Sequence, residues 1–237
     1  MGRRAGGMAG DKLLNWRHLR VLAATYGVMS DFCLKGENVH LWRGEHHVLR
    51  GVRFQVRSGE CLQLTGANGA GKTTLLRTAC GLAYPEGGEI TWCGENIRKD
   101  MQGFHAQLAY LGHEPPLKAE LTARENLRYW IGVRRRLESE ELDDALDRVG
   151  ADHWADRPVR TLSAGQKRRA ALAGLTLMRV PLWLLDEPTT NLDAEGQKLV
   201  GALIDEHLQG GGLALAAVHH ELAVAADGLQ RMELTVE

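Results

Sequence analysis

The sequence predicts an α/β fold built around one glycine-rich loop, and three stretches of the chain support this prediction. Residues 66–73 match the phosphate-loop pattern G-x-x-x-x-G-K-[ST], with a short apolar strand before them and a helix after them. Residues 36–63 alternate strand-like segments with turn signals, which suggests antiparallel hairpins leading into the loop. A highly charged segment of helical pattern begins near residue 121, between strand-like segments, and suggests a helical subdomain.

The loop has the residue types that a polyphosphate ligand requires. Its glycines let the backbone curl tightly enough to point several N–H groups inward, and the following helix adds the positive end of its dipole. Lys72 can reach the β- and γ-phosphates of a nucleotide, and the Thr73 hydroxyl can bind Mg²⁺. The alternative is a glycine-rich turn that matches by chance, which the strand–loop–helix setting disfavours. We therefore expect a nucleotide site made of Gly66, Ala67, Asn68, Gly69, Ala70, Gly71, Lys72, Thr73 and Thr74.

Composition narrows the class of protein. The 237 residues allow one large domain or two small ones, and 44% hydrophobic and 25% charged residues are ordinary values for a soluble globular protein. The net charge of −1 provides no overall basic field, so we expect no nucleic-acid partner. No run approaches the ~18 apolar residues that a membrane helix needs, so at a membrane another protein would have to span the bilayer. Four cysteines without a C-x-x-C pair predict reduced thiols rather than a metal site or a disulfide.

Residues 1–34 differ from the rest of the chain and are predicted to be an extension of a domain that covers residues 35–237. Gly, Arg and Met dominate the first ten residues, and residues 13–26 are basic, with apolar residues near helical spacing. We favour a disordered or weakly helical extension, or a misassigned start, because Met29 stands just before ordered-looking sequence. A transit peptide or a membrane-surface helix is the alternative.

In the hairpin region, Trp42 stands at the end of a strand-like segment. An aromatic ring there can stack on adenine, and a half-buried strand aromatic is the alternative. His46 and His47 follow a turn signal, so we expect them in a hairpin turn, facing solvent.

Further apolar segments predict buried strands at residues 89–93, 108–111, 181–187 and 213–218. The final residues, 221–237, are expected to form a helix, with an edge strand as a further element. We place a helical subdomain at about residues 114–160, where Thr122 and Glu125 have the spacing of a capping box. The charge cluster inside it, which begins with three arginines at 134–136, is interpreted as a solvated face.

Polar residues stand at the ends of three predicted elements. Ser163 can cap a helix whose first turn contains Gly165, leaving N–H groups open to an anion, although a simple helix cap has the same pattern. Asp186 can hold Mg²⁺ and Glu187 can polarise a water, whereas a polar strand end is the alternative. His219 follows the last strand and can donate to a γ-phosphate.

Taken together, these motifs resemble those of an ABC-type ATPase domain over about residues 36–234. Residues 162–166 (LSAGQ) resemble the family's signature sequence, and residues 182–188 (LWLLDEP) resemble its Walker B motif. Residues 191–193 resemble the D-loop, and His219 resembles the switch histidine. The resemblance implies a phosphate-loop NTPase fold of ABC type: a RecA-like core, an antiparallel β-subdomain and an inserted helical subdomain.

The resemblance also implies a head-to-tail homodimer that hydrolyses ATP with Mg²⁺. Each ATP would lie between the loop of one subunit and the signature residues of the other, which are Ser163, Gly165 and Gln166. Glu187 would be the general base, His219 would stabilise the transferring phosphoryl group beside Lys72, and Asp193 would couple the two sites.

One position departs from the family pattern. The family usually has Gln after the strand at 108–111, where it contacts Mg²⁺ and the attacking water, and this chain has His113. A neutral imidazole still offers a donor or a lone pair, so the position stays a nucleotide-site candidate.

Residues 110–127 are most similar to one branch, the ATP-binding subunits of cytochrome c maturation haem exporters. That branch implies a peripheral protein on the cytoplasmic face of the bacterial inner membrane, an ABC-type haem-exporting translocase. Its partners would be a CcmB-like membrane subunit, docked around residues 113–126, with CcmC- and CcmE-like proteins. ATP hydrolysis would release a haem-loaded chaperone for cytochrome c assembly.

Three alternatives stay open. One is the ATPase subunit of another exporter, for a drug, a lipid or an ion. A soluble ribosome-associated ABC protein is disfavoured by the single phosphate loop, the single signature and the lack of a heptad run. A scaffold without catalysis is disfavoured because Lys72 and Glu187 are both present.

Overall fold

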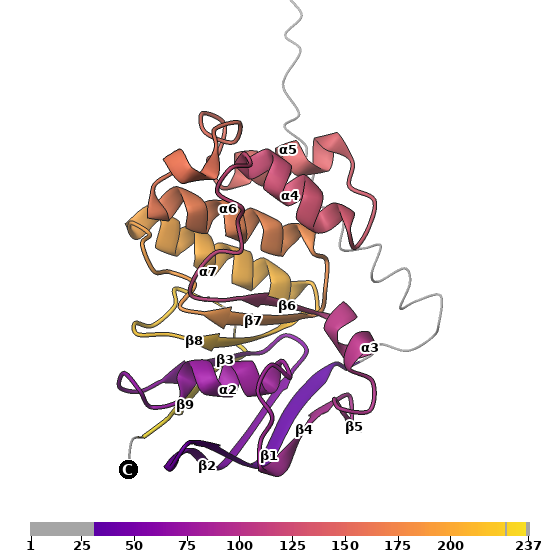
Figure 1. The fold of residues 1–237 in the computed structure, drawn as a ribbon, viewed down its shortest axis with the longest axis vertical. Coiled ribbons are helices and arrows are strands. Elements are labelled where there is room, and N and C mark those ends of the chain that lie inside the picture. Colours follow the sequence, from indigo (N-terminus) through magenta and orange to yellow (C-terminus); the bar gives the residue numbers. More distant parts are fainter. Residues whose placement is uncertain (1–30, 226, 236–237) are drawn as a thin grey trace, which may run out of the picture. The chain divides into compact units, whose positions relative to one another are not determined.

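The computed structural model describes residues 31–225 and 227–235, and the fold below is that of the unit Phe32–Glu237 (Figure 1). Most of the expected extension, residues 1–30, lies outside the described residues. The domain is expected from residue 35, whereas the compact unit begins at Phe32 and β1 begins at Cys33. Phe32 already belongs to the domain: its N–H donates to Ser58 Oγ at 3.0 Å, and its ring stacks on Trp92 with 5.6 Å between the ring centroids.

The residues before and just after the loop form a four-stranded antiparallel sheet. Its strand order is β2-β1-β4-β5, with bounds β1 (Cys33–Arg43), β2 (His46–Arg57), β4 (Gly87–Trp92) and β5 (Glu95–Asn96). The expected antiparallel hairpins are therefore confirmed. The expectation that His46 and His47 lie in the turn is wrong, because the turn needs only residues 44 and 45. Both histidines pair within the ladder, opposite Arg43 and Trp42.

A second, five-stranded sheet is wholly parallel and forms the centre of the domain. Its order is β6-β7-β8-β3-β9, with bounds β6 (Leu108–Leu111), β7 (Leu182–Asp186), β8 (Leu213–Ala217), β3 (Cys61–Thr65) and β9 (Leu229–Glu233). Four of the strands, β6, β7, β8 and β3, are almost continuously apolar because helices or the other sheet cover both faces.

The chain end matches the expectation in part, because the expected edge strand is present as β9. The described residues after 220 contain no helix, and β9 pairs in parallel with β3 at the edge of the sheet. Three of its residues, Gln230, Arg231 and Glu233, are exposed, which is typical of an edge strand.

Two hydrophobic cores lie on the two faces of the parallel sheet (Figure 1). The first core is formed by residues of the antiparallel sheet, α2 (Lys72–Ala79), α3 (Met101–Ala106) and alternate residues of the parallel strands. The other joins the remaining strand residues to α6 (Ala164–Leu177) and α7 (Ala194–Gln209), and extends to α4 (Ala123–Gly132) and α5 (Ser139–Arg148), which pack on α6. A short 3₁₀ turn, Val159–Thr161, precedes α6.

Local sequence signals account for the helix starts. Thr122 Oγ1 accepts from the Glu125 N–H at 3.1 Å, and the Glu125 carboxylate accepts from the Thr122 N–H at 2.8 Å, which confirms the predicted capping box. The α6 start has the same arrangement between Ser163 and Gln166.

The arginines after α4 are a solvated face only in part: Arg134 and Arg136 are exposed, as expected, but Arg135 is partly buried, and two of the three bind backbone carbonyls. Arg134 donates to the His105 carbonyl at 3.1 Å, and Arg135 donates to the Leu177 carbonyl at 2.8 Å and pairs with Glu141. The reason is that the last carbonyls of a helix lack partners within the helix, and here a guanidinium supplies one at the end of α6.

The cysteines carry thiols rather than disulfides, and burial raises the pKa of the Cys61 thiol to about 12. Within the described ranges, no cluster of three or more His, Cys, Asp or Glu side chains is arranged to hold a metal ion. None of the helices there has both the length and the apolar character needed to cross a membrane.

Candidate functional site

The predicted site residues meet at the carboxyl-terminal edge of the parallel sheet. β3 runs into the loop, β7 ends at Asp186, β6 ends two residues before His113, and β8 ends two residues before His219. Parallel strands place all their carboxyl ends at one edge, so the fold gathers groups that are far apart in sequence. The clearest example is the Thr73 hydroxyl, which donates to Asp186 Oδ1 at 3.0 Å.

The loop can be formed only because glycines occupy its sharpest bends. Gly66, Gly69 and Gly71 have φ of +132°, +83° and +97°. A Cβ at Gly66 would lie 2.2 Å from the Leu234 carbonyl oxygen, so this position also excludes a side chain by contact. Gly71 is the N-cap of α2 and offers no side-chain cap, which leaves the first N–H groups of the helix open to an anion.

Lys72 is buried in the loop with its ammonium group held in place. Its Nζ donates to the carbonyl oxygens of Gly66 at 2.6 Å and Ala67 at 3.0 Å. An ammonium has three donors, so these two bonds orient it and leave one N–H for a phosphate oxygen.

Asp186 is buried at the tip of β7 and has a partner for each carboxylate oxygen. Thr73 donates to Oδ1, and the Tyr110 hydroxyl lies 3.5 Å from Oδ2. Burial raises the pKa of Asp186, while the Thr73 hydrogen bond acts in the opposite direction. A buried carboxylate beside a hydroxyl is an oxygen donor set that suits Mg²⁺, whose charge would favour the ionised form. The residues present therefore fit this ion.

Glu187 follows in a strained left-handed conformation, φ +50°, which is uncommon for a residue with a side chain. Its Oε1 lies 2.6 Å from His219 Nε2, and its Oε2 accepts from the Thr190 hydroxyl at 3.1 Å. His113 Nε2 is 3.8 Å from the same Oε2. Burial opposes ionisation of Glu187, but the hydrogen bonds from Thr190 and His219 outweigh it and lower its pKa.

The structure distinguishes between the two adjacent histidines. Both rings are exposed, but the ring of His219 contacts Glu187. Sequence reasoning identified His113, Glu187 and His219 but missed Thr190 and Tyr110. The position of Tyr110 within a predicted strand beside β7 could not be known without the strand order.

The signature residues are not brought to the loop within one chain. Among residues 31–225 and 227–235, no hydrogen bond or ion pair joins Ser163 or Gln166 to the loop, and their side chains form the helix cap. A Cβ on Gly165 would lie 2.8 Å from the Asn191 carbonyl oxygen, so this turn packs closely against the segment at 191–193.

Trp42 is 39% exposed and is already stacked on one side. Its ring lies parallel to that of His47 (6°), with 3.7 Å between the centroids, and His40 lies close to both. The sequence alone does not indicate this contact of His47, because the contact depends on cross-strand pairing. His47 also lines a pocket of about 440 Å³ beside the loop, together with Gly69, Ala70 and two arginines. Stacking of Trp42 on adenine remains a prediction.

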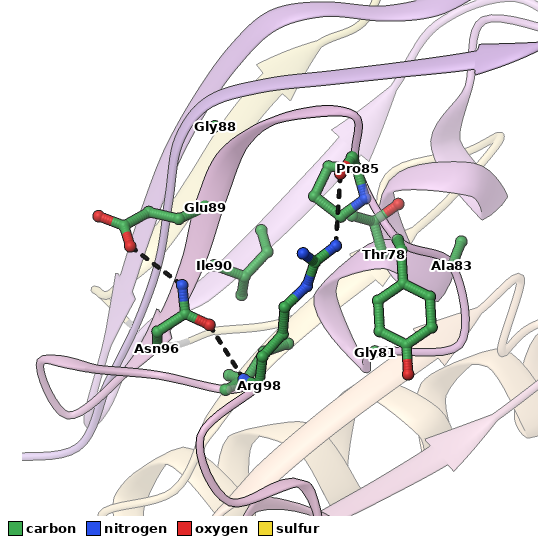
Figure 2. A pocket seen from close by; sticks show the side chains of 11 residues that line it. Thr78, Gly81, Ala83, Pro85, Gly88, Glu89, Ile90, Asn96 and Arg98 are labelled. Carbon is green, nitrogen blue, oxygen red and sulfur yellow. Dashed lines mark hydrogen bonds between the residues drawn. The ribbon is translucent and has the colours of Figure 1, made fainter.

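A second pocket lies between the end of α2 and β4–β5, and it is too small for a nucleotide. Its volume is about 30 Å³, room for about one or two waters. Figure 2 shows Arg98 reaching across it to the Pro85 carbonyl, at 3.4 Å, while Asn96 bonds to Glu89. The Arg98 guanidinium also lies 4.9 Å from the centre of the Tyr84 ring. These contacts serve the packing of the turn.

Comparisons with known proteins agree with this geometry. Residues 49–190 match the family described as ABC transporter. The chain is 46% identical over 200 residues to the cytochrome c biogenesis ATP-binding export protein CcmA of Methylococcus capsulatus, covering 84% of this chain and 97% of that protein. It is 43% identical over 205 residues to a putative bifunctional cytochrome c-type biogenesis protein, CcmAE, of Salmonella choleraesuis, covering 85% of this chain and 59% of that protein.

Among solved structures, the chain resembles the ATP-binding subunit of an ABC transporter. The TM-score is 0.71 at 27% identity, covering 78% of this chain and 79% of that one. The fold predicted from the sequence is confirmed by this likeness together with the two sheets described above.

Proposed function

The chain belongs to the ABC transporter ATPases and, within them, to the CcmA family of cytochrome c biogenesis export proteins, and from this premise we propose how it works. It hydrolyses ATP as an ABC-type haem-exporting translocase and thereby drives release of a haem-loaded chaperone in cytochrome c-type biogenesis. The observation that carries the proposal is the convergence of Lys72, Thr73, Asp186, Glu187 and His219 on one edge of the parallel sheet.

In the proposed mechanism, the loop holds the polyphosphate. The open N–H groups at the start of α2 and the remaining donor of Lys72 bind the β- and γ-phosphate oxygens. Thr73 and Asp186 would hold Mg²⁺, which would neutralise phosphate charge when bound. Because Thr73 and Asp186 already contact each other, little rearrangement of these side chains is required.

Glu187 then accepts the proton from the attacking water. Its lowered pKa keeps it ionised near neutral pH, and Thr190 and His219 fix its orientation. His219 supplies a ring N–H that stabilises charge developing on the transferring phosphoryl group, a role in which one donor contributes about 10²–10³ in rate. His113, close to the same carboxylate, orients the water in place of the family's glutamine.

A second copy of the chain completes each site. Ser163, Gly165 and Gln166 lie apart from the loop of their own chain, and the positive end of the α6 dipole suits the γ-phosphate of a nucleotide on the other copy. We propose a head-to-tail homodimer in which Asp193 couples the two sites. In this chain Asp193 caps α7 through the Gly196 N–H at 2.8 Å.

A CcmB-like membrane subunit is the proposed partner, with CcmC- and CcmE-like proteins nearby. Its docking surface would be residues 113–126, within a helical subdomain at about residues 114–160 of an ABC domain. Asn126 fixes the backbone of this segment. Its side chain accepts from the Lys118 N–H at 2.7 Å and donates to the Lys118 carbonyl at 3.0 Å. Tyr129 of α4 and Val133, directly after the helix, are exposed apolar side chains that extend the surface.

The name of one relative also supports this assignment. The relative named CcmAE combines the names of CcmA and CcmE in one protein. A subunit that docks on a membrane partner would work as a peripheral protein at the cytoplasmic face of the bacterial inner membrane.

The test is co-purification from detergent-solubilised membranes with a tagged Glu187→Gln variant and ATP. We expect to recover a CcmB-like membrane protein and a haem signal on a chaperone, and we expect Lys72→Ala, as a matched control, to recover less of both. Recovery of an unrelated permease would keep the ATPase and reject the haem branch. Recovery of ribosomes without a membrane protein would reject the transporter assignment.

A further inference from the structure

Arg168, in the second turn of α6, has a position that the mechanism above does not use. It is only 1% exposed. Its two terminal nitrogens donate to two successive backbone carbonyls, those of Gly112 at 2.9 Å and His113 at 2.8 Å. Its Nε has no hydrogen-bond partner among the described residues.

A buried guanidinium at this point requires an explanation. Charged side chains are rarely fully buried unless they are paired, and among the described residues none of the ion pairs includes Arg168. The neighbours on the same helix, Ala170 to Leu172, show that apolar residues fill this core well. Burial lowers the pKa of Arg168, and the carboxylates of Asp186 and Glu187 oppose this effect. The side chain therefore lies within electrostatic reach of the candidate site.

The two bonds connect two functional segments. Gly112 and His113 form the segment after β6 that brings the His113 ring to 3.8 Å from Glu187. Arg168 stands five residues after Ser163, which is about 7.5 Å along the axis of a helix. The start of α6 and the His113 segment are thus joined through the first two turns of a rigid helix. The planar guanidinium of arginine presents several N–H donors and can bond two adjacent carbonyls, whereas a lysine ammonium is a single point charge.

We propose that Arg168 is a positioning residue that couples the two sites of the dimer. When the start of α6 engages the nucleotide of the second copy, Arg168 carries that displacement to His113 beside Glu187 in its own site. This inference rests on the proposed ATPase dimer. It assigns a function to a residue outside the loop, the carboxylates and the histidines.

The test uses Arg168→Met and Arg168→Lys in the full-length protein purified with its membrane partners. Lys167→Gln is the matched control, because it removes a neighbouring cation whose side chain is partly exposed. For Arg168→Met we expect kcat for ATP to fall at least about ten-fold, since a misplacement of about 1 Å can reduce rate about 10²-fold. We expect KM to change less than about two-fold, because the loop that binds phosphate is untouched, and the Hill coefficient to fall towards one.

Hydrogen exchange gives a readout independent of turnover. Backbone amides in residues 111–118 should exchange faster in Arg168→Met, while those of the loop at 66–74 should not change. Arg168→Lys should be intermediate in both measurements, because its ammonium reaches one carbonyl rather than two. If Arg168→Met does not fold, Arg168→Lys decides the outcome alone.

Two results separate this inference from the proposed function. If the wild-type complex is active and both Arg168 variants match Lys167→Gln in kinetics and in hydrogen exchange, the coupling role is overturned. The ATPase assignment then stays intact. A rise in KM at unchanged kcat would also overturn it. An inactive wild-type complex that binds no ATP would reject the proposed function itself.

Discussion

Replacing Glu187 by Gln should reduce turnover by about 10²–10⁴ while leaving the fold and ATP binding in place. The substitution preserves the shape of the side chain and changes only its charge. The amide oxygen can still accept from the Thr190 hydroxyl, now 3.1 Å from Oε2, and the amide nitrogen can donate to His219 Nε2, now 2.6 Å from Oε1. What is lost is a carboxylate that is ionised near neutral pH, and with it the proton acceptor.

The size of the effect follows from that loss. A positioned general base contributes about 10²–10⁴ in rate, so the activation free energy should rise by about 3–5 kcal/mol. Lys72, Thr73 and Asp186 are untouched, and the dissociation constant for ATP should stay within about three-fold of the wild-type value.

The assay compares phosphate release at saturating ATP with equilibrium ATP binding and thermal unfolding. Glu140→Gln is the matched control, because it makes the same chemical change on an exposed face of α5 and should leave all three measurements unchanged. Turnover of Glu187→Gln within about two-fold of the wild type would refute the assignment of the base. Loss of ATP binding at unchanged stability would instead show that the carboxylate holds the nucleotide.

Three further predictions concern the phosphate loop, the stacking of Trp42 on the adenine ring, and the buried His207. Gly66→Ala should destabilise the fold by more than about 2 kcal/mol and abolish ATP binding, because its Cβ would meet the Leu234 carbonyl at 2.2 Å. Gly69→Ala, with positive φ but open space around its Cβ, should cost only about 1 kcal/mol, and equal effects of the two in urea unfolding would contradict this. Trp42→Ala should weaken ATP binding about three- to ten-fold while Trp42→Phe retains it, and unchanged affinity in Trp42→Ala would leave the ring a packing residue. His207 is fully buried, and burial lowers its pKa from 6.5 to about 4. Between these values the unfolded chain binds a proton that the folded chain does not, so about 3 kcal/mol of stability should be lost as the pH falls from 6.5 towards 4. Urea unfolding at several pH values checks this, and the same pH dependence in His207→Gln would show that another group is responsible.

The sequence by itself determined the elements whose signals are local. The apolar runs of β3, β6, β7 and β8 predict strands because residues buried on both faces must all be apolar. The capping boxes at Thr122 and Ser163 involve residues three apart, so their spacing alone indicates the helix starts. The glycine pattern predicts the loop for the same reason, since a backbone bend depends on the residues that make it.

Only the tertiary structure decided which side chains meet. The contact of Thr73 with Asp186 requires β3 and β7 to end at one edge of a sheet, and the order of strands in a sheet is not a local property. The expected helix after residue 220 failed for the same reason, because β9 exists by pairing with the free edge of β3.

The side chains that were misjudged or missed depend on partners distant in sequence. Arg134 and Arg135 have the composition of a solvated face, yet they bind carbonyls on α3 and α6 that the fold brings near them. His47 stacks on Trp42 because a two-residue turn aligns their strands, and Arg168 is buried because β6 ends beside α6. Residue type and spacing indicate what a side chain can bind, whereas the packing of distant elements decides which partner lies within reach.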